Sequence, residues 1–415
     1  MNMRSQAVGV DSTPEPALDS PAGWRVVSAV FVLTAVTYGS AYSFSAMFPG
    51  LADDFRASRS AVALVFSLAA AGFHTFGAVA GKLADHVSSR LLCVLGVLAM
   101  SAGYLAAATA TSLPALYLFY GAVVGLGVGL LYVPALAAVQ SWFQRHRSAA
   151  SGIATGGLGL GTVLLPLGVG QLLPHLGWRI CFVLLGVIVA TLGTPAALLV
   201  HRRPRPAAAH AADQVADNHP AVTLRTATFA RFYVSVLLAS ICTFIPYVHL
   251  VAAALDQGSS LQAGTVLIGL IGVGNIAGRF LLGGIADRLG RVRVLAILTL
   301  ILGGSFLIWA IEPALPGLAA FALVFGLAYG GCVSLYPAVA TDLFGANKIG
   351  STVGILYTSV AIAALGGPTL AGYLHDHTHS YTLPAVLAAA AALTAGLITF
   401  GLHPAGRTSR AETMR

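Results

Sequence analysis

The chain has 415 residues, of which 57% are hydrophobic and 9% are charged, and its formal net charge is +8. With a mean hydropathy of +0.85, this composition excludes an ordinary soluble globular domain and indicates an integral protein of a lipid bilayer. The basic charge would suit a nucleic-acid-binding protein, but it is distributed as in membrane proteins, so we expect no nucleic-acid partner.

Apolar stretches recur along the chain, each with about the 20 residues that a helix needs to cross a bilayer. We predict twelve membrane-spanning helices, at 24–45, 60–81, 91–111, 115–139, 149–173, 179–200, 229–253, 263–285, 294–312, 315–339, 349–373 and 381–402. The polar first 23 residues lack the apolar core of a cleaved signal peptide, so we expect the first span to remain in the mature protein. The predicted organisation is a tail (1–23), a six-helix half (24–200), a charged Pro/Ala-rich linker (201–228), a second six-helix half (229–402) and a tail (403–415).

Lys and Arg residues are divided unequally between the two sides of the predicted spans. Eighteen of the 22 fall in the tails, in the linker and in loops on the same side. Because cytoplasmic segments are enriched in Lys and Arg, we predict a multi-pass protein of the cell (cytoplasmic or inner) membrane with both termini in the cytoplasm. Arg56, Arg59 and Arg179 fall on the outer side, and Arg279 falls within a span.

Landmarks in the two halves repeat at a constant offset. Asp85 in "GKLADH" and Asp287 in "GGIADR" are 202 residues apart, and Pro166 and Pro368 have the same spacing. A fixed offset indicates an internal duplication, and six spans in each copy give both copies the same orientation in the membrane.

These two copies carry a recognisable motif in the loops after the second and eighth spans. The pattern "G-x-L-A-D-x-x-G-R" is nearly complete in the second copy, which contains Asp287, Arg288 and Arg291. The first copy contains Asp85 and Arg90 but has Ser88 where the glycine is usual. With this pattern the chain resembles the major facilitator superfamily. The resemblance implies the all-α major facilitator fold, with twelve transmembrane helices in two parallel six-helix repeats, and an acid–base latch between helix ends on the cytoplasmic face. A tight turn with cytoplasmic charge is the alternative reading of the motif.

Two further stretches are similar to the monocarboxylate transporters and their relatives, the oxalate–formate exchangers. They are "GW" at 23–24 and "WFQRHRSAASGIATGG" at 142–157. The second contains Arg145 and Arg147, which we expect to take part in gating at the cytoplasmic face. The small residues that follow allow helices to approach closely.

Arg279 lies before the end of the apolar run in "GNIAGRFLLGG", and none of the acidic residues lies deep in a span to neutralise it. A charge at that depth costs at least about 2.5–3.5 kcal/mol and usually marks a substrate path. Snorkelling toward the cytoplasmic interface is the alternative, since Asp287 is only eight residues further on. Because the guanidinium fork fits a carboxylate through two parallel hydrogen bonds, Arg279 indicates an anionic substrate.

The resemblance implies that Arg279 is the span-eight arginine that holds the substrate carboxylate. Asn275, one turn earlier, falls where many animal members have an aspartate that is the usual candidate for proton coupling. We therefore expect His249, with His74 as a second candidate, to carry the proton, because imidazole titrates near neutral pH. Hydrogen bonding between helices is the alternative role for both histidines.

Two positions lack cations that the resemblance leads us to look for. Val360 stands where the oxalate exchangers are expected to have a lysine, and Tyr42 stands where animal monocarboxylate carriers keep one. One cation predicts a substrate with one carboxylate. Tyrosines of the spans are expected to form the rest of the pocket, with interhelical packing as the alternative. They are Tyr38, Tyr120, Tyr329 and Tyr357.

The sequence thus predicts a secondary transporter, not an enzyme, that moves a small monocarboxylate such as lactate or pyruvate together with a proton by alternating access. An organic-anion exchanger of the oxalate–formate type and a membrane sensor that binds the anion without moving it are the alternatives. We expect no cofactor and no metal, since "HDHTH" at 375–379 lies on a short outer loop without a second ligand cluster.

Overall fold

The computed structural model describes residues 17–84, 86–203, 226–345 and 349–402, and within these ranges it contains helices and no strands. The helices of the first half are α1 (Pro21–Tyr42), α2 (Phe44–Asp54), α3 (Arg59–Leu83), α4 (Ser89–Ala108), α5 (Leu113–Leu116), the π-helical η1 (Tyr117–Val124), α6 (Gly125–Trp142), α7 (Arg147–Ile188), the π-helical η2 (Val189–Gly193) and α8 (Thr194–Leu199). Those of the second half are α10 (Ala227–Thr243), α11 (Pro246–Asp256), α12 (Leu261–Leu289), α13 (Arg291–Ile311), α14 (Leu315–Phe344), α15 (Ile349–Thr378) and α16 (Thr382–Phe400).

Eleven helical stretches in the described part of the chain are long and apolar enough to cross a membrane. One of them, Arg147–Leu199, has 53 residues, far more than the roughly 20 that one crossing needs. It is broken at Gly177, where φ is 74° and ψ is 166°, a conformation that is essentially restricted to glycine. This stretch therefore makes two crossings, and the predicted all-α fold with twelve spans is confirmed.

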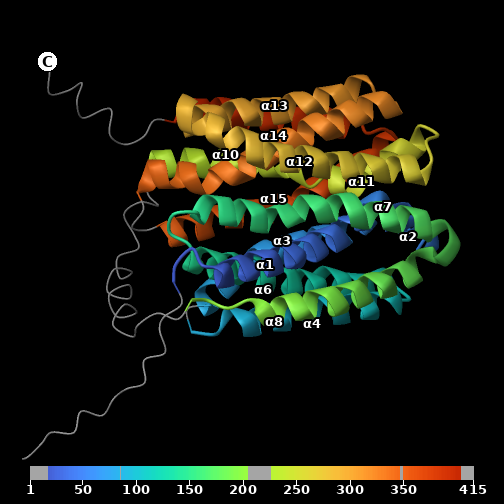
Figure 1. Ribbon diagram of the computed structural model, residues 1–415. Coiled ribbons are helices and arrows are strands. Elements are labelled where there is room, and N and C mark those ends of the chain that lie inside the picture. The colour runs from blue at the N-terminus through green and yellow to red at the C-terminus, as the bar shows by residue number, and fades with distance from the viewer. Residues whose placement is uncertain (1–16, 85, 204–225, 346–348, 403–415) are drawn as a thin grey trace, which may run out of the picture.

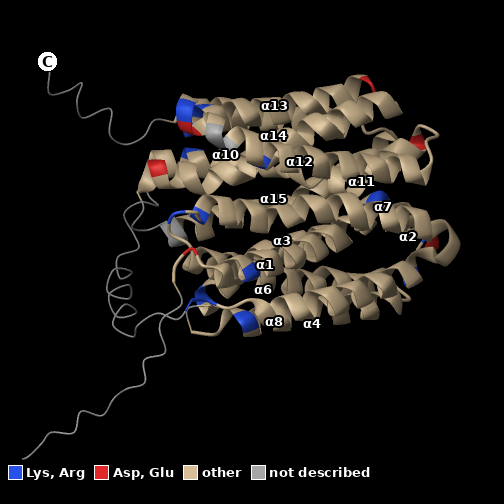
Figure 2. Cartoon of the chain, in the orientation of Figure 1, with Lys and Arg blue, Asp and Glu red and all other residues tan. Residues whose placement is uncertain are grey.

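The two halves lie side by side as two bundles with nearly parallel helices (Figure 1). Pro21, Trp142 and Ala227 mark one end of both bundles, which we call the linker end because the first half finishes there and the second begins. The opposite end, which contains Gly177 and Asp256, is called the far end. Most of the described Lys and Arg side chains gather at the linker end (Figure 2).

The first span of each half is interrupted at an equivalent position. The break between α1 and α2 falls at Ser43, whose hydroxyl donates to the carbonyl of the preceding turn at 2.8 Å. The break between α10 and α11 falls at Phe244, two residues before Pro246, which cannot donate a backbone hydrogen bond. Tyr42 and Phe244 are separated by the 202 residues of the repeat, and both line the central cavity described below. The duplication therefore places one helix break from each half at the same site.

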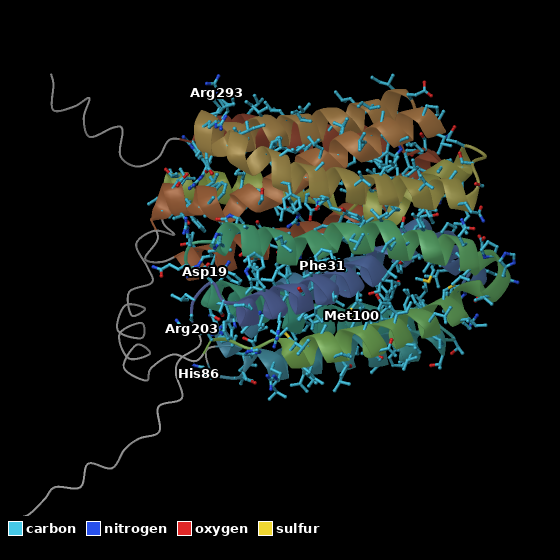
Figure 3. The ribbon with its side chains drawn as sticks, viewed as in Figure 1. Asp19, Phe31, His86, Met100, Arg203 and Arg293 are labelled. Carbon is cyan, nitrogen blue, oxygen red and sulfur yellow. The ribbon has the colours of Figure 1, made fainter. Side chains whose placement is uncertain are left out.

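α7 holds the first half together and also contacts the second half. Gly157 and Gly161 lie directly against the backbone of α1 at Phe31 and Ala35, where a Cβ would have no room; Figure 3 labels Phe31 on α1. On another side of α7, a Cβ on Gly159 would clash with α12. The closest helix contacts of α7 thus fall at Gly157, Gly159 and Gly161, whereas Gly152 and Gly156 have room for a Cβ. Another contact between the halves joins α3 to α15, where Thr369 donates to the Ser67 hydroxyl at 3.1 Å.

Candidate functional site

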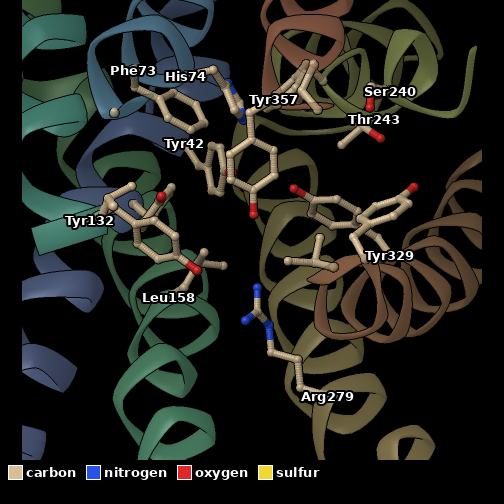
Figure 4. A pocket seen from close by; sticks show the side chains of 17 residues that line it. Tyr42, Phe73, His74, Tyr132, Leu158, Ser240, Thr243, Arg279, Tyr329 and Tyr357 are labelled. Atoms are coloured by element: carbon tan, nitrogen blue, oxygen red, sulfur yellow. The ribbon is translucent and has the colours of Figure 1, made fainter. Parts of the chain in front are cut away.

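A cavity lies between the two halves, lined by residues of both. Arg279 supplies the only charged side chain among the described residues that line it, and aromatic rings cover most of the wall (Figure 4). The lining residues are Tyr38, Tyr42, Phe73, His74, Gly77, Tyr132, Val133, Leu158, Ser240, Thr243, Phe244, Arg279, Tyr329, Val333, Tyr336, Tyr357 and Val360. The cavity therefore combines one cation with an aromatic and hydroxyl-bearing wall.

Arg279 points into this cavity rather than toward the end of its helix (Figure 4). Its Nε donates to Oδ1 of Asn275, one turn earlier on α12, at 2.8 Å. The two terminal nitrogens of the guanidinium have no hydrogen-bond partner among the described residues. Asn275 is 1% exposed, so a buried amide fixes one edge of the guanidinium and leaves the other edge available to a carboxylate. This placement disfavours the snorkelling alternative.

Three of the four expected tyrosines, Tyr38, Tyr329 and Tyr357, line the cavity, and the hydroxyl of Tyr357 faces the guanidinium of Arg279 (Figure 4). Tyr120 does not. Its side chain is fully buried inside the first half, and its hydroxyl donates to the carbonyl of Ala41 at 3.0 Å. For Tyr120 the structure therefore favours the packing alternative, because its helix turns this ring away from the second half.

Several lining aromatics were not expected from the sequence, namely Phe73, Tyr132, Phe244 and Tyr336. Tyr336 follows Tyr329 by seven residues, or two helical turns, so helical spacing could have identified it. Tyr42, which stands where a lysine was looked for, also lines the cavity. Between the cavity and the far end, its ring stacks on Tyr247 of α11 with 3.8 Å between centroids.

His74 lies in the cavity lining on α3. Its Nδ1 is 2.8 Å from the carbonyl oxygen of Ala70, and because a carbonyl only accepts, Nδ1 carries the proton of the neutral ring. Nε2 has no described protein partner. Neutral His74 therefore has a free lone pair that can take up a second proton.

His249 lies elsewhere, fully buried in α11 on the far-end side of the cavity. Its Nε2 donates to the carbonyl of Pro368 at 2.8 Å, and its Nδ1 is 3.0 Å from the hydroxyl of Tyr381. Both ring nitrogens are thus occupied. The structure brings His74, and not His249, together with Arg279.

The hydroxyl of Tyr381 connects His249 to an ion pair between the halves. Arg59 of α3 donates to both carboxylate oxygens of Asp256 at 2.6 Å and to the Tyr381 hydroxyl at 2.8 Å. The side chains of Arg59 and Asp256 are 24% and 33% exposed. The geometry is bidentate, the stronger arrangement for an arginine and a carboxylate.

A second carboxylate and a histidine complete this group. Asp376 of α15 accepts the backbone N–H groups of Arg59 and Ser60 at 2.9 and 3.0 Å, and the Ser60 hydroxyl at 2.7 Å. His375 lies 3.5 Å from Asp256. We call the group the far-end network, and it consists of Arg59, Ser60, His249, Asp256, His375, Asp376 and Tyr381. It fastens the start of α3 to the second half at the far end.

At the linker end of the second half, the motif residues form an ion-pair group between neighbouring helices. Arg291 donates to Asp287 at 2.9 Å and to Asp342 of α14 at 3.2 Å. Gly290 makes the turn between α12 and α13 with φ 94°, which favours glycine. Arg288 is exposed. This group joins three helices of the second half, and Asp342 was not expected from the sequence.

The linker end of the first half has its own carboxylate, Asp19, which was also not expected (Figure 3). It accepts the backbone N–H groups of Gln144, Arg145 and His146 at 3.0–3.4 Å. Desolvation acts to raise the pKa of Asp19, but these hydrogen bonds outweigh it and hold that pKa below its usual value. Arg147 donates to the carbonyl of Phe143 at 3.2 Å. In the structure, therefore, this loop is held to the start of its own half.

Two further expectations concern the linker-end motif and a metal site. Arg90 is exposed, and Asp85 lies outside the described residues. Within the described ranges, no group of three or more His, Cys, Asp and Glu side chains is placed to hold a metal ion.

Comparisons with known proteins agree with the fold. The model of the "Major Facilitator Superfamily" matches residues 30–315 and 232–413. Monocarboxylate transporter 11 of Homo sapiens is 30% identical over 407 residues, which cover 94% of this chain and 85% of that protein. Monocarboxylate transporter 13 of Bos taurus is 31% identical over 373 residues, which cover 89% and 86%.

Solved structures of transporters share the architecture at low sequence identity. A peptide transporter, POT, in complex with sulfate superposes with a TM-score of 0.72 at 18% identity, covering 90% of this chain and 93% of that one. A bacterial homologue of the human lysosomal transporter Spinster, in an inward-facing and unoccupied conformation, gives 0.70 at 16% identity, covering 92% and 97%. The chain belongs to the major facilitator superfamily of membrane transporters. Within that superfamily it is a relative of the monocarboxylate transporters.

Proposed function

We propose that this transporter moves a small monocarboxylate, of the lactate or pyruvate type, together with a proton. The observation that carries the proposal is the free edge of the Arg279 guanidinium in a cavity with no acidic side chain among its described lining residues. A charge without a counter-ion in a membrane interior is costly, and an incoming carboxylate supplies the missing partner. Nearby tyrosine hydroxyls suit the hydroxy or keto group of such acids.

His74 is the proposed proton carrier, since its Nε2 lone pair is free and its ring lines the same cavity as Arg279. A monocarboxylate and a proton together carry no net charge, so the loaded and empty transporter bear the same charge in the membrane. Loading both therefore avoids an electrostatic cost in the occluded state. His249 has the proposed role of a positioning residue in the far-end network, because both of its nitrogens are engaged.

The transport cycle proposed here is a rocking of the two halves about the cavity. The linker end is assigned to the cytoplasm, because eleven of the described Lys and Arg residues lie there and three, Arg56, Arg59 and Arg179, lie at the far end. The far-end network and the stack of Tyr42 on Tyr247 close the outer side in this state, and both must separate for the cavity to open outward. We propose that the cytoplasmic gate is formed by charged residues of both halves. They are Asp287, Arg288, Arg291 and Asp342 of the second half, and Arg145 and Arg147 in a loop of the first.

An exchanger of the oxalate–formate type is the second candidate, and the number of cations separates it from the first. Val360 lines the cavity, at the position where a second cation for a dicarboxylate was looked for. A second carboxylate would enter the cavity without a partner, which costs binding free energy. A membrane sensor that binds the anion without moving it differs from both, because it gives no uptake into liposomes.

Competition against labelled lactate in proteoliposomes tests this proposal. In the wild-type protein, unlabelled monocarboxylates should compete well and oxalate poorly. Val360→Lys should shift the preference toward oxalate, because it adds the second cation while penalising lactate with an unpaired charge. We expect the ratio of the two inhibition constants to change by at least about tenfold, which corresponds to one hydrogen-bonded charge pair.

Val333→Lys is the matched control, because Val333 also lines the cavity but on α14 rather than α15. A smaller shift in that variant would locate the second carboxylate near Val360. A wild-type protein that already prefers oxalate to lactate would contradict the one-cation argument and favour the exchanger.

A further inference from the structure

Aromatic side chains make up eight of the seventeen residues that line the cavity, and they come from both halves (Figure 4). Tyr38, Tyr42, Phe73 and Tyr132 belong to the first half, and Phe244, Tyr329, Tyr336 and Tyr357 belong to the second. Lactate and pyruvate each have three carbon atoms and no ring that could stack on these side chains. The wall thus offers much more aromatic surface than the smallest monocarboxylates can use.

The rings surround the space in front of Arg279, and several of them also contact one another. Figure 4 shows Tyr132 and Leu158 on one side, Tyr329 on the other, and Tyr357 opposite the guanidinium. Tyr38 meets Tyr132 and Phe73 edge to face, with interplanar angles of 88° and 89° and centroids 5.7 and 6.0 Å apart. Edge-to-face contacts of this kind leave ring surface free for a further ring.

Hydroxyl groups on the same wall are also free. The hydroxyls of Tyr132 and Tyr357 make no hydrogen bond to another described residue. Phenol rings with free hydroxyls offer an apolar face together with a hydrogen-bonding edge. A pocket of this composition recognises a substrate that is flat and apolar in its body and polar at its ends.

We propose that the preferred substrate is a monocarboxylate that carries an aromatic ring, with the carboxylate on Arg279 and the ring among Tyr132, Tyr329 and Tyr357. This inference rests on the proposed function and specifies its substrate class. Aromatic pairs add binding free energy beyond that of buried area, and this extra contribution distinguishes an aromatic substrate from an equally large aliphatic one.

This inference is tested by isothermal titration calorimetry on the purified full-length protein. Three acids with the same head group are titrated, namely lactate, 3-phenyllactate and 3-cyclohexyllactate. We expect 3-phenyllactate to bind at least about tenfold more tightly than lactate, and several-fold more tightly than its cyclohexyl analogue. Tyr132→Leu should remove most of the preference of phenyl over cyclohexyl.

Tyr373→Leu is the matched control, because Tyr373 is 52% exposed on α15 and does not line the cavity; its affinities should equal those of the wild type. Equal or weaker binding of 3-phenyllactate relative to lactate would overturn the aromatic inference while leaving the monocarboxylate proposal intact. Equal binding of the phenyl and cyclohexyl acids would overturn it as well. Failure of all three acids to bind would instead contradict the proposed function itself.

Discussion

Replacing Arg279 with lysine is expected to abolish most transport, although the positive charge is kept. An ammonium group cannot form two parallel hydrogen bonds with a carboxylate, and it cannot use one edge for Asn275 while presenting a fork to the substrate. Hydrogen bonds to charged groups are worth about 1.5–3 kcal/mol. The loss of one such bond predicts a decrease in kcat/KM of roughly ten- to a hundredfold.

Initial rates of labelled lactate uptake into proteoliposomes measure this loss. Arg293→Lys is the matched control, because Arg293 is exposed at the linker end of α13, well away from the cavity (Figure 3). That variant should transport like the wild type. Near-normal uptake by Arg279→Lys, at equal protein content and thermal stability, would refute a substrate-binding role for Arg279.

Arg59→Gln is expected to shift the transporter toward a state that is open at the far end. Glutamine cannot replace the bidentate pair with Asp256 and the hydrogen bond to Tyr381, whereas the backbone bonds to Asp376 can remain. Because Arg59 and Asp256 are each at least two-thirds buried, we estimate a loss of about 1.5–3 kcal/mol for this closed state. The ratio of open to closed molecules should rise roughly ten- to a hundredfold.

Distances between spin labels at Ser112→Cys and Leu315→Cys report the separation of the two halves at the far end, since Ser112 directly precedes α5 of the first half and Leu315 begins α14 of the second. The native cysteines are buried. Arg179→Gln is the matched control, because Arg179 pairs with Asp54 at 2.8 Å at the same end but within one half. Arg59→Gln should add a population with a longer distance that Arg179→Gln lacks. Identical distance distributions in both variants would show that the far-end network does not hold the halves together.

The fold could be predicted because a membrane span is recognised by the length and hydropathy of one continuous stretch of sequence. The break at Gly177 falls between the two spans predicted at 149–173 and 179–200. The exception is local as well. The break at Ser43 has no proline to announce it, and the first span continues beyond the predicted boundary to Asp54.

The site was predictable in part, for a reason that also lies in the membrane. A charge in a span is so costly that Arg279 stood out without a structure, and the i, i+4 rule placed Asn275 beside it. Tyrosines are different, since a ring suits both a cavity wall and a helix interface. Tyr120 and Tyr357 could therefore be distinguished only by their three-dimensional positions.

Long-range pairs were the least predictable part of the molecule. Arg59, Asp256 and Tyr381 lie at the ends of three separate helices and are far apart in the sequence. Each is a polar residue of a kind that is common where a helix meets a loop, so its sequence context does not mark it. The same holds for Asp19, whose partners begin 125 residues further along the chain. Only the packing of the helices brings such groups together.

Proton-coupled transport is tested most directly by the accumulation of labelled lactate in proteoliposomes. A pH gradient is imposed across the membrane, and the membrane potential is held at zero. With the outside acidic, the wild-type protein should drive the internal lactate concentration transiently above the external one. A protonophore should abolish this accumulation, and His74→Gln should uncouple lactate movement from the gradient. Uptake that never exceeds equilibrium and ignores the pH gradient, but depends on a counter-anion inside the liposomes, would contradict symport and show that the protein is an exchanger.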